Sequence, residues 1–135
     1  MQVIILAGGK GTRLKPYTVA IPKPLVPVGE MPILEIILRQ LRRDGFKNVT
    51  MAVNHHARLI KSFFGDGSDW NLSINYSLED KPLGTAGPIR LVENLDDHFL
   101  VMNGDVLTTL NYKALKEYHI QEGNAITVSS FRKDV

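Results

Sequence analysis

The sequence opens on a short apolar run that ends abruptly at glycines, and this pattern restricts the choice of fold more than any other feature. Residues Val3–Ala7 are continuously apolar, and Gly8 and Gly9 follow directly. A run of this length without alternating polar residues is typical of a strand in the middle of a parallel sheet, buried on both faces. We therefore expect an α/β domain with a loop at the end of its first strand.

Further along the chain, strand-like apolar runs alternate with stretches that have the 3.6-residue period of a helix. We expect further strands at 49–53, 72–76, 99–102 and 125–131, and helices at 33–44, 57–64, 85–94 and from Asn111, as the cap, to just before Gly123. This alternation predicts a Rossmann-like three-layer α/β/α sandwich with a mostly parallel central sheet. Because the chain stops directly after its last expected strand, we interpret residues 1–135 as a truncated, single domain.

Composition and charge exclude several classes of function. The formal net charge is only +2, without the dense basic stripe of a nucleic-acid-binding surface. There are no cysteines, which excludes disulfides and thiolate metal sites. No apolar run approaches the length of a membrane span, and the N-terminus lacks the features of a signal peptide. A cytoplasmic protein without nucleic-acid or membrane partners is expected.

The loop after the first expected strand combines glycines with positive charge. Gly8, Gly9 and Gly11 lie close together, and no acidic residue occurs before Glu30. Glycines let backbone N–H groups approach an anion closely, and the guanidinium of Arg13 can bind phosphate oxygens in a fork. The spacing matches neither the Walker loop nor the dinucleotide-binding fingerprint. From the glycines alone, an anion-binding loop and a tight surface turn are equally compatible.

Two later segments favour the anion-binding interpretation. Lys23 lies between Pro22 and Pro24, and proline restricts the backbone, so the ammonium is directed rather than mobile. Asp105 follows the fourth expected strand, after Asn103 and Gly104. An aspartate after glycine is by itself more typical of a turn or a helix cap. Because ligands of open α/β sheets bind beyond the carboxyl ends of the strands, its position opposite the glycine loop instead favours a site.

Together these motifs resemble the signature of the sugar-phosphate nucleotidylyltransferase family, and are closest in character to its mannose-1-phosphate guanylyltransferase-like members. The resemblance covers nearly the whole chain, and its motifs are Leu6–Leu14, Pro22–Gly29, Pro82–Gly87 and Asn103–Asp105. It implies transfer of a nucleoside monophosphate from a nucleoside triphosphate to a sugar 1-phosphate, with release of pyrophosphate. It also implies that residues 1–135 form the N-terminal nucleotide-binding part. The sugar-binding part and a second metal-binding aspartate are then expected after residue 135, so these residues alone should turn over poorly.

The resemblance also implies roles for individual residues. Arg13 and Lys23 are the expected catalytic residues, holding the β- and γ-phosphates and compensating charge at the α-phosphate, respectively, and Asp105 is the expected ligand of Mg²⁺. These roles fit the chemistry, because nucleotidyl transfer depends on positioning and on charge compensation. The expected nucleotide-binding residues are Leu6, Ala7, Gly8, Gly9, Gly11, Thr12, Arg13, Glu79, Gly84 and Thr85.

The identity of the base depends on Glu79, which in the family pattern reads the base edge while Gly84 offers its backbone. A carboxylate accepts two donors, and guanine presents such a pair at N1–H and N2–H₂, whereas uracil and thymine do not. GTP is therefore favoured, although Glu79 is nearly as compatible with a merely polar loop. A uridylyl-, thymidylyl- or adenylyltransferase, a non-catalytic regulatory module on the same fold, and a homo-oligomer all remain open alternatives.

The histidines are not assigned a function at this level. His55 and His56 are adjacent, and neighbours in an extended chain point apart, which does not favour a shared metal. We interpret this pair, together with His98 and His119, as structural or surface residues.

Overall fold

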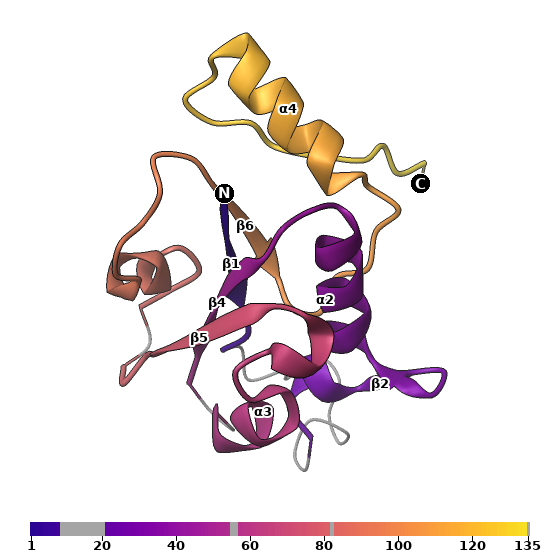
Figure 1. Ribbon diagram of the computed structural model, residues 1–135, viewed down its shortest axis with the longest axis vertical. Coiled ribbons are helices and arrows are strands. Elements are labelled where there is room, and N and C mark those ends of the chain that lie inside the picture. The colour runs from indigo at the N-terminus through magenta and orange to yellow at the C-terminus, as the bar shows by residue number, and fades with distance from the viewer. Residues whose placement is uncertain (9–20, 55–56, 82, 135) are drawn as a thin grey trace.

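A four-stranded parallel sheet forms the centre of the structure, a computed structural model that describes residues 1–8, 21–54, 57–81 and 83–134 (Figure 1). The strands lie in the order β5-β4-β1-β6, and every neighbouring pair is parallel. Their bounds are β1 (Gln2–Leu6), β4 (Asn48–Val53), β5 (Ser73–Leu78) and β6 (Phe99–Asn103). The first run of the sequence thus forms an interior strand, and the predicted Rossmann-like, mostly parallel α/β fold is confirmed.

One face of the sheet is covered by two amphipathic helices, α2 (Ile33–Arg43) and α3 (Ala57–Phe64). Their buried sides pack against alternate residues of the strands in a single cluster, which includes Val3, Ile5, Leu34, Leu38, Leu41, Val49, Met51, Ile60, Phe64 and Ile74. The opposite face carries Ile4, Thr50 and Ala52, all buried. The segment that follows the 3-10 turn η4 (Gly87–Leu91) lies on this second side of the sheet.

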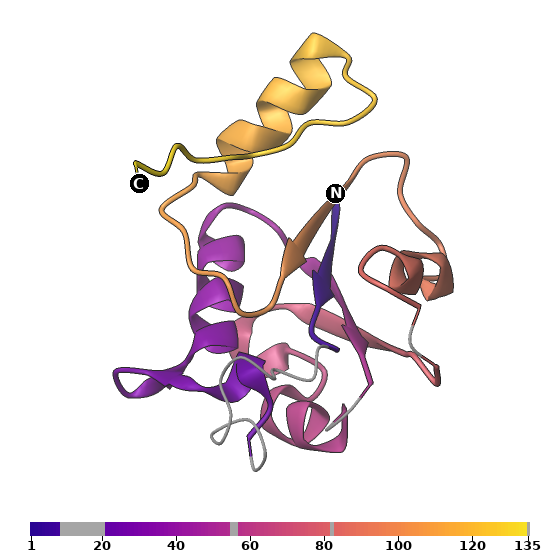
Figure 2. The ribbon, with the colours of Figure 1, turned by 180° about the vertical axis from the view of Figure 1, so that it is seen from behind.

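A third helix, α4 (Tyr112–Glu122), lies beyond the end of the sheet at which the N-terminus is found (Figures 1 and 2). As predicted, the side chain of Asn111 caps it by accepting a hydrogen bond from the Ala114 N–H, and Gly123 ends it in the left-handed region. No helix in the described part of the chain is long and apolar enough to span a membrane.

Asp44 joins α4 to the end of α2. Its carboxylate accepts a 2.9 Å hydrogen bond from the Arg43 Nε–H and another of 2.9 Å from the Tyr112 backbone N–H. The pKa of Asp44 is lowered, chiefly by the hydrogen bond from Arg43. Burial raises this pKa, and the hydrogen bond from the Tyr112 N–H lowers it further. Burial and the nearby Asp44 carboxylate raise the pKa of the Tyr112 hydroxyl. One buried carboxylate therefore holds the first turn of α4 against the last turn of α2.

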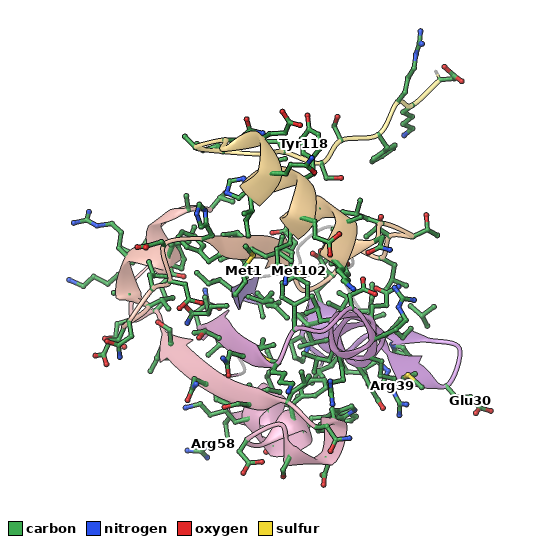
Figure 3. The ribbon with its side chains drawn as sticks, turned by 45° about the horizontal axis from the view of Figure 1, so that its top comes forward. Met1, Glu30, Arg39, Arg58, Met102 and Tyr118 are labelled. Atoms are coloured by element: carbon green, nitrogen blue, oxygen red, sulfur yellow. The ribbon has the colours of Figure 1, made fainter. Side chains whose placement is uncertain are left out.

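The segment between the glycine loop and α2 contains structure that the sequence did not predict. Strands β2 (Pro27–Val28) and β3 (Met31–Pro32) form a short antiparallel hairpin, turned by Gly29 at a φ of +67°. Figure 3 shows Glu30 at the tip of this hairpin, which projects away from the body of the molecule.

Two predicted elements are wrong. The helix expected at 85–94 is reduced to the short turn η4: no side chain caps it, and Asn94 adopts a left-handed φ of +55°, with which a right-handed helix cannot continue. The strand expected at 125–131 has no hydrogen-bonded neighbour within the described residues. Its apolar side chains Ile126, Val128 and Phe131 are exposed. A single extended segment without a partner is not stable as a strand.

Candidate functional site

The carboxyl ends of all four central strands meet at one edge of the sheet, because the strands are parallel and aligned in register. Leu6, the last residue of β1, is aligned with Ala52 on one side and with Asn103 on the other. The residues that leave this edge are Gly8 after β1, Asn54 after β4, Glu79 after β5 and Asp105 after β6. Neighbouring strands lie about 4.8 Å apart, so this row of residues spans roughly 14 Å, with Glu79 and Asp105 at its two ends.

Lys23 is held at this edge by a firmly anchored turn, η2 (Lys23–Leu25). Pro24 and Leu25 are buried, and Leu25 belongs to the main core. The Val26 N–H donates to the Lys23 carbonyl over 3.2 Å and closes the turn. The Lys23 side chain is left 32% exposed and forms an ion pair with the carboxylate of Asp105. The backbone around Lys23 is thus fixed by proline and by core packing, while its ammonium stays accessible.

Asp105 is placed by the glycine that precedes it. The Gly104 N–H donates to the Leu6 carbonyl over 3.0 Å, which extends the pairing of β1 and β6 beyond the strand itself. A Cβ atom at Gly104 would lie 3.1 Å from Cγ2 of Ile5, which is closer than ordinary packing. The side chain of Asp105 is 21% exposed. Lys23 and Asp105, which the sequence analysis assigned to one site, are in direct contact.

The start of the glycine loop lies between these residues and β4. The Ala7 N–H donates to the Ala52 carbonyl over 2.9 Å, and Ala7 is buried. At Gly8, a Cβ atom would lie 3.1 Å from both Cγ and Nδ2 of Asn54. The amide of Asn54 therefore occupies the space that a side chain at position 8 would need. No role was predicted for Asn54, although Gly8 and Asn54 each directly follow an expected strand, which was a signal that the two could meet.

Glu79 and Gly84 belong to a loop that closes on itself. The Glu79 N–H donates to the Val53 carbonyl over 2.9 Å, which fixes the end of β5 beside β4. The Glu79 carboxylate accepts a hydrogen bond from the Leu83 backbone N–H. Gly84 has a φ of +78°, a conformation that favours glycine, and Thr85 is exposed. Glu79 thus has a structural role in this loop, which the sequence did not reveal.

The remaining predicted site residues, Gly9, Gly11, Thr12 and Arg13, lie outside the described residues. A separate hollow of about 670 Å³ lies on the second face of the sheet, lined by residues that include Gln2, Thr50, Asn75 and Asp96. None of the predicted site residues that the structure describes lines it.

Comparisons with known proteins identify the family of the chain. The family model described as nucleotidyl transferase matches residues 2–135. A mannose-1-phosphate guanyltransferase of Candida albicans is 36% identical over 99% of this chain and 38% of its own length. A UTP–glucose-1-phosphate uridylyltransferase of Synechocystis is 36% identical over 95% of this chain and 36% of its own length.

Solved structures give the same answer. The structure of HddC from Yersinia pseudotuberculosis, complexed with GMP-PN, superposes with a TM-score of 0.76 at 32% identity, over 88% of this chain and 54% of that one. The chain belongs to the nucleotidyl transferase family. This nucleotidyl transferase chain spans well under half the length of the curated relatives that it matches.

The residues of this nucleotidyl transferase fit a hard divalent cation at one point. Asp105 supplies carboxylate oxygens, the ligands that Mg²⁺ prefers, and Mg²⁺ usually takes only one or two carboxylates together with phosphate and water. Within residues 1–8, 21–54, 57–81 and 83–134, no group of three or more His, Cys, Asp or Glu side chains is arranged to hold a metal.

Proposed function

We propose that this chain is the nucleotide-binding part of a sugar-1-phosphate nucleotidylyltransferase that uses Mg²⁺ and favours GTP. The reaction transfers GMP from GTP to a sugar 1-phosphate and gives a nucleoside diphosphate sugar and pyrophosphate. The observation that carries the proposal is the ion pair between Lys23 and Asp105, located beside Gly8 at the carboxyl edge of a parallel sheet. This is the edge at which α/β folds bind ligands.

In the proposed reaction, a phosphate oxygen of the sugar 1-phosphate attacks the α-phosphorus of the nucleotide. A bond forms to that oxygen, the bond to the β-phosphate oxygen breaks, and pyrophosphate leaves with the electron pair. Lys23 compensates the negative charge that grows on the α-phosphate oxygens, and Arg13 holds the β- and γ-phosphates. Asp105 would hold Mg²⁺, which supplies charge compensation at the phosphates when it is bound.

The ion pair supports complementary roles for Lys23 and Asp105 before and after nucleotide binds. In the described structure, each charge is compensated by the other. A triphosphate offers Lys23 a new anionic partner, and Mg²⁺ offers Asp105 a new cationic one. The exchange leaves neither charge uncompensated, so it avoids the cost of a desolvated, unpaired ion in the loaded site.

The preference for GTP is supported by Glu79 and by the relatives. The Glu79 carboxylate has several lone pairs, and the hydrogen bond from Leu83 uses only one of its two oxygens. The other oxygen can accept from guanine. The Candida albicans relative is a mannose-1-phosphate guanyltransferase, and HddC was solved with a guanine nucleotide analogue. The uridylyltransferase of Synechocystis is the reason to keep UTP as the second candidate.

The decisive test is a panel of GTP, UTP, dTTP and ATP, each measured with and without Mg²⁺. Fluorescence or calorimetric titration of this chain gives the affinity for each nucleotide. Pyrophosphate release by a full-length version of the enzyme, after addition of sugar 1-phosphate, gives turnover. We expect tightest binding of GTP and a requirement for Mg²⁺. A chain that binds none of the four would contradict the proposal, whereas nucleotide binding without pyrophosphate release from the full-length version would indicate the regulatory module.

A further inference from the structure

Two histidines from distant parts of the sequence are in contact far from the candidate nucleotide site. Nδ1 of His98 lies 3.1 Å from Nε2 of His119. Their rings are 5.0 Å apart between centroids and meet edge to face at 77°. His98 directly precedes β6 and His119 lies in the last turn of α4, so the contact links the sheet to that helix.

The orientation of His119 is fixed by a second set of contacts. Its Nδ1 lies 2.8 Å from Oγ1 of Thr127, and the Asn124 Nδ2–H donates to the same oxygen over 3.2 Å. The Asn124 backbone N–H also donates to the His119 carbonyl, over 3.3 Å. If the His119 Nδ1–H donates to Thr127, the lone pair of His119 Nε2 faces His98. An oxygen acceptor on the other ring nitrogen is what orients a metal-binding imidazole, and the Thr127 hydroxyl oxygen can serve as that acceptor here.

We propose that His98 and His119 bind a borderline divalent transition-metal ion, with Zn²⁺ as the representative ion. Metal–imidazole bonds are about 2.0–2.1 Å long, so an ion shared by two nitrogens 3.1 Å apart would subtend an angle of roughly 100°. This angle lies between the values for octahedral and tetrahedral coordination. The metal takes the place of the proton between the two rings, after the rings turn about their side-chain bonds to direct both lone pairs at it.

The proposed site is open and distinct from the Mg²⁺ site. The described residues provide no third His, Cys, Asp or Glu ligand there, and His98 is exposed, so water completes the coordination. Imidazole nitrogen selects Zn²⁺, Ni²⁺ or Cu²⁺ over Mg²⁺, whereas the carboxylate of Asp105 selects the hard ion. His98 and Asp105 lie at opposite ends of β6, roughly 20 Å apart along an extended strand.

The structural consequence concerns α4. Asp44 holds the first turn of this helix against α2, and the histidine pair holds its last turn against the start of β6. A metal bond between the two rings would replace a single hydrogen bond by two coordinate bonds. We therefore expect metal binding to stabilise the packing of α4, because an ion that binds only the folded chain raises its stability.

The test is a titration of the chain with Zn²⁺ in competition with a chromophoric chelator at neutral pH. We expect one equivalent to bind, and His98→Asn and His119→Asn each to weaken binding at least 10-fold. The other two histidines of the chain, His55 and His56, provide the matched control, since His55→Asn/His56→Asn should bind as the unchanged chain does. Thr127→Val keeps both ligands and should weaken binding about 10-fold to 100-fold.

The outcomes that overturn the proposal are specific. Wild-type affinity in both single variants, or loss of binding in the His55→Asn/His56→Asn control, would show that the ion does not bind at His98 and His119. Because a single variant could fail to fold, the unchanged chain supplies a second measurement. Electron paramagnetic resonance of bound Cu²⁺ should show coupling to two nitrogens, and a signal without nitrogen coupling would contradict the site.

Discussion

The ammonium of Lys23 is paired with the carboxylate of Asp105, which joins a proline-bounded turn to the end of β6. The backbone is fixed on both sides of the ion pair. Pro24 and Leu25, which follow Lys23, are buried, and Gly104, which precedes Asp105, packs on β1. The pair lies at the edge where a ligand of this fold binds. Its charges are therefore in place before the proposed nucleotide binds, and the predictions below begin from this pair.

Removing either partner of the ion pair should affect binding and turnover differently. Asp105→Asn should abolish the Mg²⁺-dependent part of GTP binding, because the amide is a poor ligand for a hard cation. Lys23→Ala should reduce turnover of a full-length enzyme by about 100-fold to 1000-fold, the usual effect of losing one group that stabilises the transition state. Lys113→Ala, on the exposed side of α4, is the control. Normal turnover in Lys23→Ala would remove this lysine from the mechanism.

Replacing Glu79 by glutamine separates its two contacts. The glutamine oxygen can still accept the Leu83 N–H, so the loop should keep its shape, while the new NH₂ group faces the donors of guanine. We expect GTP affinity to fall about 10-fold or more and UTP affinity to change little, consistent with about 1.5–3 kcal/mol for a hydrogen bond to a charged group. Asp80→Asn, the neighbouring exposed carboxylate, should leave both affinities unchanged. An unaltered ratio of GTP to UTP affinity in Glu79→Gln would end the assignment of the base.

Gly8 and Asn54 should show compensating substitutions. Gly8→Ala places a methyl group 3.1 Å from the Asn54 amide, and overpacking of this kind costs about 1–3 kcal/mol. Asn54→Ala removes the obstructing amide, so the double variant should be less destabilised than the two single variants predict. Denaturant unfolding of the four chains measures the coupling directly. Additive effects would show that the two residues do not share this space.

The carboxylate that joins α2 to α4 should make stability depend on pH in the acid range. The pKa of Asp44 is lowered in the folded chain, so its contribution to stability is complete above the unfolded-state pKa of about 3.9 and is lost as the pH falls through the lower folded value. The difference in unfolding free energy between the unchanged chain and Asp44→Asn should therefore be largest near neutral pH and shrink below about pH 4.

The control for Asp44 is Glu117→Gln. Glu117 forms an exposed ion pair with Lys113 at 4.0 Å, and such pairs contribute less than about 1 kcal/mol. A difference for Asp44→Asn that stays constant down to pH 2 would contradict the role of its charge. In that case the role of Asp44 would be limited to accepting the hydrogen bond from the Tyr112 N–H, which an asparagine oxygen can also accept.

Local patterns in the sequence were sufficient for most of the fold. The apolar run of β1, the periodicity of α2 and the cap at Asn111 each depend on neighbours in the chain, and each was placed within one or two residues. The helix at 85–94 was expected from Thr85 as its N-cap, but no side chain caps the turn that forms there, so the local signal was not sufficient. The strand at 125–131 failed because pairing depends on a partner strand, which a local pattern does not reveal.

At the candidate site, too, some contacts could be predicted from the sequence and others could not. Lys23 and Asp105 could be assigned to one site because both motifs were expected at the same edge of a parallel sheet, and they are in contact. The contact of Gly8 with Asn54 and the hydrogen bond from Leu83 to Glu79 were not predicted, since they depend on side-chain packing and on loop closure. The pairing of His98 with His119 was missed for the same reason, as it requires α4 to run back to the start of β6.

The close packing of Gly104 on Ile5 makes the spacing of two neighbouring strands a determinant of ligand geometry. A Cβ atom at Gly104 would lie 3.1 Å from Cγ2 of Ile5, so the approach of the ends of β1 and β6 depends on how Ile5 packs. A core substitution that shifts Ile5 by a fraction of an ångström would alter where a ligand at this edge can lie, although it does not touch that ligand. Variation in specificity among relatives of this chain can therefore originate beneath the site, in residues that no ligand contacts.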